Sequence, residues 1–162
     1  MSKIEANLFL RCYMEMEDKL LQLNRLLANF FVMYVKLHRY GWYVKGEQRI
    51  SLQPMFTSNI AVCKEHIDHI VELILALGGQ PYATMVKYVK EATIPEATAD
   101  DEVHEMMEQL ISDTDALLKD IDFIMNKNDN EQKSRFILYT LTNVERDLFK
   151  LQHESERYLN RR

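Results

Sequence analysis

Residues 56–81 decide the fold, and they read FTSNIAVCKEHIDHIVELILALGGQP. Their apolar residues recur every three or four positions, as one face of an α-helix requires; they are Phe56, Ile60, Cys63, Ile67, Ile70, Ile74 and Leu77. Just upstream, Ser51 suits a helix N-cap and Pro54 suits the first turn. Gly78 and Gly79 then give a strong stop signal. The stretch therefore predicts a long helix from Ser51 to Leu77.

Three further stretches carry the same helical spacing. The first ends near Gly46, because glycine readily takes the left-handed conformation that terminates a helix. The next begins near Thr98 with Asp101 as a capping partner, and a polar turn at 127–130 separates it from the last. Their apolar stripes are Leu20, Leu23, Leu27, Phe30, Tyr34 and Leu37; Val103, Met107, Leu110, Thr114, Leu117, Ile121 and Ile124; and Phe136, Tyr139, Val144, Leu148, Leu151 and Leu159.

Four long helices, each with one apolar face, bury those faces together in a four-helix bundle. The connection at 81–99 is too long for a tight turn, and residues 84–91 within it suit a short crossing helix. Bundles with one long crossover are of the ferritin-like kind. We therefore expect an all-α, ferritin-like four-helix bundle with a short helix in the middle crossover.

Composition supports this class and excludes others. Of 162 residues, 47% are hydrophobic and only 4 are Gly and 3 Pro, which excludes a many-stranded β-fold and a disordered chain. The net charge of -5 gives no global attraction to nucleic acid or an anionic membrane. No apolar run is long enough to span a bilayer. Two cysteines make no disulfide framework, so we expect a cytoplasmic protein without membrane contact.

The predicted four-helix bundle domain comprises residues 19–162, and residues 1–18 form an N-terminal extension to it. The acidic patch near Glu15 and Asp18 marks a break, so we expect a separate N-terminal helix. It serves either as an extra packing helix or as a docking arm for DNA or a neighbouring subunit. Lys3 and Arg11 are its candidate DNA contacts, although residues 1–24 carry a net charge of only -1.

A candidate metal site lies on the helix over 51–77. Asp68 and Glu72 are four residues apart and share one row of that helix, while His69 lies three residues before Glu72. Carboxylate and imidazole together suit iron, zinc or manganese, although a solvated helix face has the same pattern. His38 is either a ligand or proton relay, or a packed interface histidine. Cys63 is expected in the core, as are the methionines, Met106 and Met107 among them.

The motifs VKLHRYGWYVKG at 35–46, SL at 51–52 and ALGGQP at 76–81 resemble the Dps family of starved-cell DNA-protection mini-ferritins. The resemblance implies a hollow twelve-subunit shell that oxidises iron at sites shared across subunit interfaces and stores a ferric mineral. It also implies DNA binding through mobile basic termini in many members.

The family pattern is only partly present. Asp68 and Glu72 match its two carboxylate ligands, but Gly41 and Gln53 stand where the family has histidines, and Thr57 replaces a common acidic residue. Iron binding is therefore expected to be weakened, with His38, Glu65 or His69 as substitutes.

We therefore expect a Dps-like homo-oligomeric cage that binds and stores iron and protects DNA, with an incomplete ferroxidase site whose activity is weak, relocated or absent. The alternative is a DNA-packaging shell with little or no iron oxidation. A purely structural shell is a third reading.

Overall fold

The computed structural model describes residues 3–98, 102–126 and 131–160, without the side chains of Lys3, Ala6, Cys12 and residues 131–134. All the regular secondary structure in this part of the chain is helical. The helices are α1 (Lys3–Tyr43), α2 (Gly46–Ala76), α3 (Met85–Glu91), α4 (Val103–Asn126) and α5 (Glu131–Leu159).

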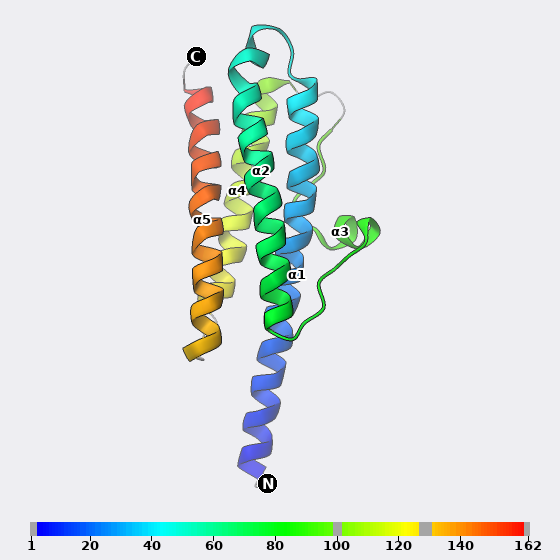
Figure 1. Cartoon of the computed structure of the whole chain (residues 1–162), viewed down its shortest axis with the longest axis vertical. Helices are drawn as coiled ribbons and strands as arrows, with labels where there is room; N and C mark the ends of the chain where they lie inside the picture. The colour runs from blue at the N-terminus through cyan, green and yellow to red at the C-terminus, as the bar shows by residue number, and fades with distance from the viewer. Residues whose placement is uncertain (1–2, 99–101, 127–130, 161–162) are drawn as a thin grey trace.

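Four of these helices form the bundle, and α3 lies outside it against α1 (Figure 1). The neighbouring pairs within the described ranges are α1 with α2, α2 with α5, α5 with α4, and α4 with α1. Helices α2 and α4 are therefore diagonal, and the connection between them, described over residues 77–98, is the long crossover of the bundle. This confirms the predicted all-α bundle with its short helix in a long middle crossover.

Local signals explain two of the helix ends. Gly78 has φ +83°, and the backbone N–H of Gly79 donates to the Ile74 carbonyl at 2.9 Å while that of Gly78 donates to Leu75 at 2.9 Å. These two bonds form a Schellman motif, so the predicted stop after α2 is confirmed. The Thr84 hydroxyl accepts from the backbone N–H of Lys87 and caps α3 as a side-chain N-cap does.

Two predicted helix starts are wrong. Helix α2 begins at Gly46, whose φ of +63° makes the turn from α1, so Pro54 lies inside the helix and not in its first turn. The Ser51 hydroxyl donates to the Gln48 carbonyl at 3.0 Å and caps nothing. Helix α4 starts at Val103, not near Thr98. The predicted capping partner of that start, Asp101, lies outside the described residues, as does the predicted turn at 127–130.

The expected break between an N-terminal helix and the bundle is also wrong. Helix α1 runs without interruption from Lys3 to Tyr43. Glu15 and Glu17 are exposed and Asp18 is half-buried, so these carboxylates keep contact with water and do not oppose helix formation. Its first part projects beyond the bundle (Figure 1). We call residues 3–18 the N-terminal arm; the proposed domain boundary at residue 18 stays a prediction.

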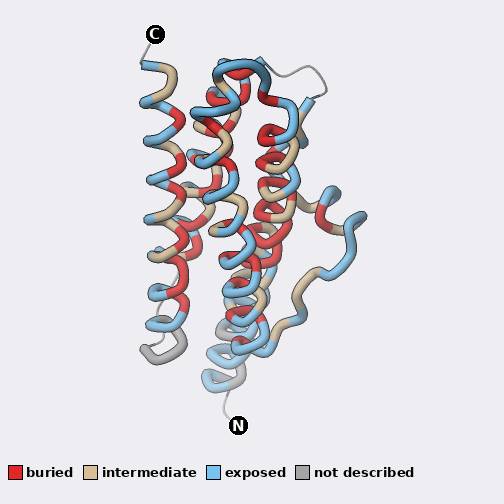
Figure 2. Tube along the Cα trace, turned by 45° about the horizontal axis from the view of Figure 1, so that its top comes forward, coloured by how far each residue is buried: buried red, intermediate tan, exposed pale blue. Residues whose placement is uncertain are grey.

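The core lies between the four long helices, where the buried side of each faces inward (Figure 2). Cys63, Met106 and Met107 are buried as expected, whereas Met14 and Met85 are exposed, so the expectation of core methionines is wrong for these two. Phe136 and Tyr139 are exposed, which corrects the predicted stripe of the last helix. The buried residues there are Ile137, Leu141, Val144, Leu148 and Leu151. None of the described helices is both long and apolar enough to cross a membrane.

A buried ion pair joins α1 to α4. Lys36 Nζ lies 2.5 Å from Asp113 Oδ2, and both side chains are almost completely inaccessible to water. Gln109 also donates to Asp113 Oδ1 at 2.7 Å. Because an unpaired charge in this position would be strongly destabilised, the pair fixes how α1 and α4 face each other.

Replacing Lys36 alone should therefore lower the free energy of unfolding far more than replacing both Lys36 and Asp113. We expect Lys36→Met to lower the free energy of unfolding by about 3 kcal/mol, since Asp113 is left buried without its cation. The double variant Lys36→Met/Asp113→Leu should recover most of this loss in denaturant titrations. Lys119→Met, which breaks the exposed Lys119–Asp115 pair, is the control and should change little. A double variant as unstable as Lys36→Met would contradict this account.

Candidate metal site and the groove between α2 and α5

The predicted carboxylate pair lies on the exposed side of α2. Asp68 and Glu72 are one helical turn apart, and the Asp68 side chain is 64% exposed. Lys64 Nζ contacts Asp68 Oδ2 at 3.3 Å. The structure therefore brings the two acids to one helix face, and within the single chain that face is open to solvent.

His38 lies apart from this pair. It packs between Tyr34 and Trp42 on α1, with ring centroids 4.7 and 5.3 Å away. Among the described residues, no three His, Cys, Asp or Glu side chains are gathered in a way that could hold a metal ion. The structure does not unite His38, Asp68 and Glu72 within one chain, and their role as ligands stays a prediction.

Gly41 and Gln53 are neighbours in space. A Cβ atom added at Gly41 would lie 3.6 Å from Gln53 Nε2 and 3.5 Å from Phe56 Cβ, which are ordinary contact distances. Gln53 Oε1 is buried and has no hydrogen-bond partner. The two positions thus form one small region of α1 and α2, in which a Cβ atom at position 41 fits without a clash.

A polar groove lies between α2 and α5 and has a volume of about 430 Å³. Its α2 side holds Glu65, His66, His69 and Glu72. Its α5 side holds Phe136, Tyr139, Thr140, Asn143, Arg146 and Asp147. The groove therefore contains Glu72 of the predicted pair together with two imidazoles.

A hydrogen bond across this groove joins the two helices. His66 is only 5% exposed, and its Nε2 lies 3.1 Å from Asp147 Oδ2. Burial works to raise the pKa of Asp147, but hydrogen bonds from Arg146 and Lys150 outweigh it and hold the pKa at about 2. Because an ionised carboxylate only accepts, His66 Nε2 carries the proton that it donates.

The protonation of His66 follows from the same surroundings. Burial lowers the pKa of His66 below its ordinary value, and the neighbouring Asp147 only partly opposes this effect. The ring is therefore neutral near pH 7, and its Nδ1 carries a lone pair. That Nδ1 is buried and has no hydrogen-bond partner within the described part of the chain.

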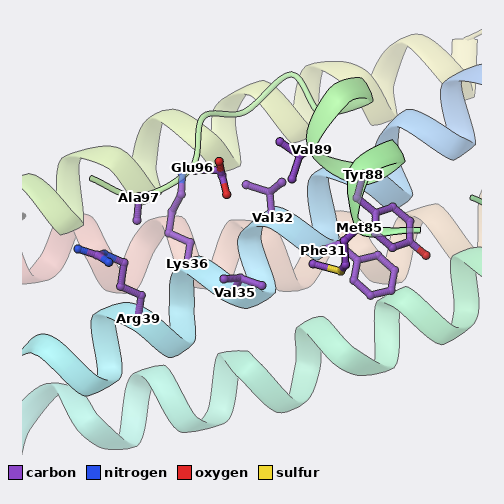
Figure 3. A pocket seen from close by; sticks show the side chains of 10 residues that line it. All are labelled: Phe31, Val32, Val35, Lys36, Arg39, Met85, Tyr88, Val89, Glu96 and Ala97. Atoms are coloured by element: carbon purple, nitrogen blue, oxygen red, sulfur yellow. The ribbon is translucent and has the colours of Figure 1, made fainter. Parts of the chain in front are cut away.

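A second, mostly apolar pocket of about 180 Å³ lies between α1 and α3 (Figure 3). The rings of Phe31 and Tyr88 stack there with centroids 3.9 Å apart. Lys36, which also lines this pocket, is already paired with Asp113. We assign this pocket a packing role.

The candidate DNA contacts lie on the N-terminal arm. The Arg11 guanidinium is exposed and donates to Glu15 at 3.0 Å, while the side chain of Lys3 lies outside the described residues. The arm also exposes large apolar side chains, with Ile4 80% and Phe9 71% accessible. The arm is therefore more apolar than basic.

Comparison with known proteins now identifies the family. The ferritin-like domain profile matches residues 20–161. DNA protection during starvation protein 2 of Bacillus anthracis is 34% identical over 132 residues, which are 80% of this chain and 90% of that protein. The chain belongs to the ferritin-like Dps family.

Solved structures agree with this assignment. A Dps protein from Bacillus brevis has a TM-score of 0.83 and 30% identity, with 90% of this chain and 97% of that chain covered. Dps from Staphylococcus aureus has a TM-score of 0.82 and 26% identity, with 88% and 95% covered. The predicted resemblance to the Dps family is thereby confirmed.

The sequence of this Dps-family chain predicted Glu65 and His69 as substitute ligands. It did not predict the contact between His66 and Asp147. The available signal was that His66 lies three residues after Cys63 and four before Ile70, within the apolar stripe of α2. A histidine on that side of a helix is expected to be buried and to need a partner. The identity of the partner was not readable from the sequence.

The lowered pKa of His66 predicts a loss of stability in mild acid. Below about pH 6.5 the unfolded chain takes up this proton more readily than the folded chain, so the stability present at neutral pH falls toward pH 5. We expect His66→Gln to flatten the decrease in thermal midpoint between about pH 7 and about pH 5. The exposed pair His104–Glu108 supplies the control, His104→Gln. An unchanged pH profile in His66→Gln would exclude this linkage.

Proposed function

We propose that the chain is the subunit of a cytoplasmic, twelve-subunit Dps-like cage that binds and stores iron and protects DNA. The family assignment over residues 20–161 supports the shell and its general role. The proposal that the chain binds iron rests on one observation, the exposed pair Asp68 and Glu72 on one face of α2. In a shell, such a face supplies anionic oxygens for Fe(II) once a second subunit covers it.

The other half of such a site fits iron poorly. Gly41 offers no side-chain donor, and Gln53 offers a neutral amide oxygen where an imidazole would bind better. The buried, unpartnered Gln53 Oε1 agrees with a position built for a polar contact that this chain does not complete. We therefore propose slow Fe(II) oxidation, so that binding and storage outweigh catalysis.

Restoring the missing side chains should restore oxidation. We expect Gly41→His/Gln53→His/Thr57→Glu to raise the initial rate of aerobic Fe(II) oxidation by about 10-fold or more. A Cβ atom at position 41 meets only ordinary contacts, so the backbone there accepts a side chain. Stopped-flow absorbance of the ferric product measures the rate.

Further substitutions in this triple variant test whether Asp68 and Glu72 are responsible for the gained oxidation rate. Adding Asp68→Ala/Glu72→Ala should remove the gained rate, because both carboxylates are then absent. The control Asp115→Ala/Asp122→Ala removes two exposed acids of α4 and should leave the gain. If the restored variant stays as slow as the natural chain, the proposed incomplete site is wrong.

DNA protection is proposed to use many weak contacts. One arm carries only Lys3 and Arg11 as candidate phosphate contacts, and Arg11 is partly satisfied by Glu15. A shell presents several arms to one duplex, so weak contacts add through high effective concentration. The alternative function, a DNA-packaging shell with little iron oxidation, follows from the same residues if the acid pair contributes nothing.

Gel-shift assays at increasing salt test the arm. We expect Lys3→Gln/Arg11→Gln to abolish most of the shift of linear DNA, because phosphate contacts supply the affinity. Lys64→Gln/Lys119→Gln removes two exposed lysines of the bundle and should keep the shift. Equal shifts for both double variants would dismiss the arm as the DNA contact.

A further inference from the structure

The N-terminal arm continues the apolar stripe of α1 beyond the end of the bundle. That stripe runs from Leu20 to Leu37 with spacings that alternate between three and four residues, and Phe9, Tyr13 and Met16 extend it in the same alternation. Such a repeat is the heptad pattern of a coiled coil, in which a second helix covers the apolar seam. The arm therefore has the sequence of a helix that packs against another helix.

Within one chain, the cover over this seam stops at Leu20. The Leu20 side chain packs against Gly79 just after the end of α2, so closely that no Cβ atom would fit at that glycine. Met16 is half-buried, whereas Phe9 and Tyr13 are 71% and 56% exposed. The arm projects past the ends of the other long helices, which leaves these two rings largely open to solvent (Figure 1).

Residues beside the seam indicate how a second arm would lie on it. Glu5 and Lys19 flank the seam on one side, at heptad positions g, and Leu10 flanks it on the other side, at position e. In an antiparallel pair, g positions face g positions and e positions face e positions. If Phe9 of each arm packs on Tyr13 of the other, Glu5 of each arm faces Lys19 of the partner subunit. The two Leu10 side chains then meet.

Other arrangements of two arms lack these opposite charges. An antiparallel pair shifted by one heptad places Glu5 or Lys19 opposite position 12, which is a cysteine. A parallel pair places Glu5 beside Leu10 and Lys19 beside Asn24. Since charges at e and g set the orientation and register of coiled coils, the sequence favours the antiparallel pair centred between Phe9 and Tyr13.

We propose that the arm pairs in antiparallel orientation with the arm of a second copy of this chain, through Phe9 and Tyr13 in the seam and Glu5–Lys19 ion pairs beside it. Because α1 already holds the arm as a helix, association requires no folding of the arm. Arg11 is exposed and lies on the side of the arm away from the seam, so this candidate DNA contact stays accessible in the pair. The pairing goes beyond the proposed iron and DNA functions and rests on neither.

Thiol cross-linking of the full-length chain tests this contact. Leu10→Cys in a Cys12→Ser background should form covalent chain dimers with a short bismaleimide, because the two side chains at position 10 meet in the pair. Cys63 is buried and does not compete for the reagent. The matched control is Asn7→Cys in the same background, since Asn7 is exposed on the same arm but lies away from the seam and should give little dimer. Equal dimer from both variants would overturn the proposal.

Charge reversal in the Leu10→Cys chain tests the orientation and register. Glu5→Lys alone and Lys19→Glu alone each place like charges opposite one another, and each should reduce the cross-linked fraction by about 5-fold or more. The combination Glu5→Lys/Lys19→Glu should restore it. Within one chain these residues are about 21 Å apart along the helix, so only a second arm brings them together. The control reversal Arg11→Glu/Glu15→Arg lies on the outward side and should change little.

Three results would overturn the paired arms. The first is cross-linking that survives both single reversals, and the second is a double reversal that fails to restore it. The third is attachment of the position-10 thiol to a bundle peptide of the second copy, identified by mass spectrometry, which would assign the seam to the partner's bundle. None of these results alters the expected oxidation rates, so the iron proposal is tested separately.

Discussion

Asn29 is the contact on which the arrangement of the bundle depends, because it fastens the long crossover to two helices at once. Its Oδ1 accepts from the backbone N–H groups of Thr93 and Ile94 at 2.7 and 3.3 Å. Its Nδ2 donates to Thr93 Oγ1 at 2.9 Å and to Asp120 on α4 at 3.3 Å. The crossover is irregular where it leaves α3, so its backbone polar groups need such partners when they are buried.

Asn24 does the same for the beginning of the crossover. Its Nδ2 donates to the Gln80 carbonyl at 3.1 Å, and its Oδ1 accepts from the backbone N–H of Tyr82 at 2.8 Å. Together with the Lys36–Asp113 pair, these asparagines make α1 the element against which the other parts are positioned. Helix α2 is held through apolar packing and a few polar contacts. His66 meets Asp147 on α5, Asn59 donates to Glu154 on α5 at 3.1 Å, and Cys63 Sγ donates to the Phe30 carbonyl on α1 at 3.3 Å.

Much of the fold was readable from the sequence because its signals are local. The Gly78–Gly79 stop and the Thr84 cap depend on residues within a few positions of each other. The start of α2 was misread because Ser51 is a good cap by type, whereas the conformation of Gly46 decides where the helix begins.

The errors have physical reasons too. Tyr139 follows Phe136 by three residues but precedes Val144 by five, which breaks the helical period. The buried stripe runs instead through Ile137 and Leu141. Only part of the candidate site could be predicted from the sequence. Asp68 and Glu72 share a helix face because of their local spacing. His66 and Asp147 are 81 residues apart and meet only in the folded chain. The proposed ligand role of Asp68 and Glu72 needs a second subunit or a bound ion, which the sequence of one chain does not specify.

The unbroken course of α1 gives the arm a fixed direction. Residues 3–18 extend for about 24 Å at the rise of an α-helix, and they continue the same axis that carries Asn24, Asn29 and Lys36. A continuous helix is much stiffer than a flexible peptide tail. Its exposed apolar side chains are therefore held in a fixed position and direction relative to the bundle. A partner that binds these side chains must lie at a defined distance and direction from the bundle. The arm therefore sets the spacing between the bundle and its partner, which a flexible tether would not do.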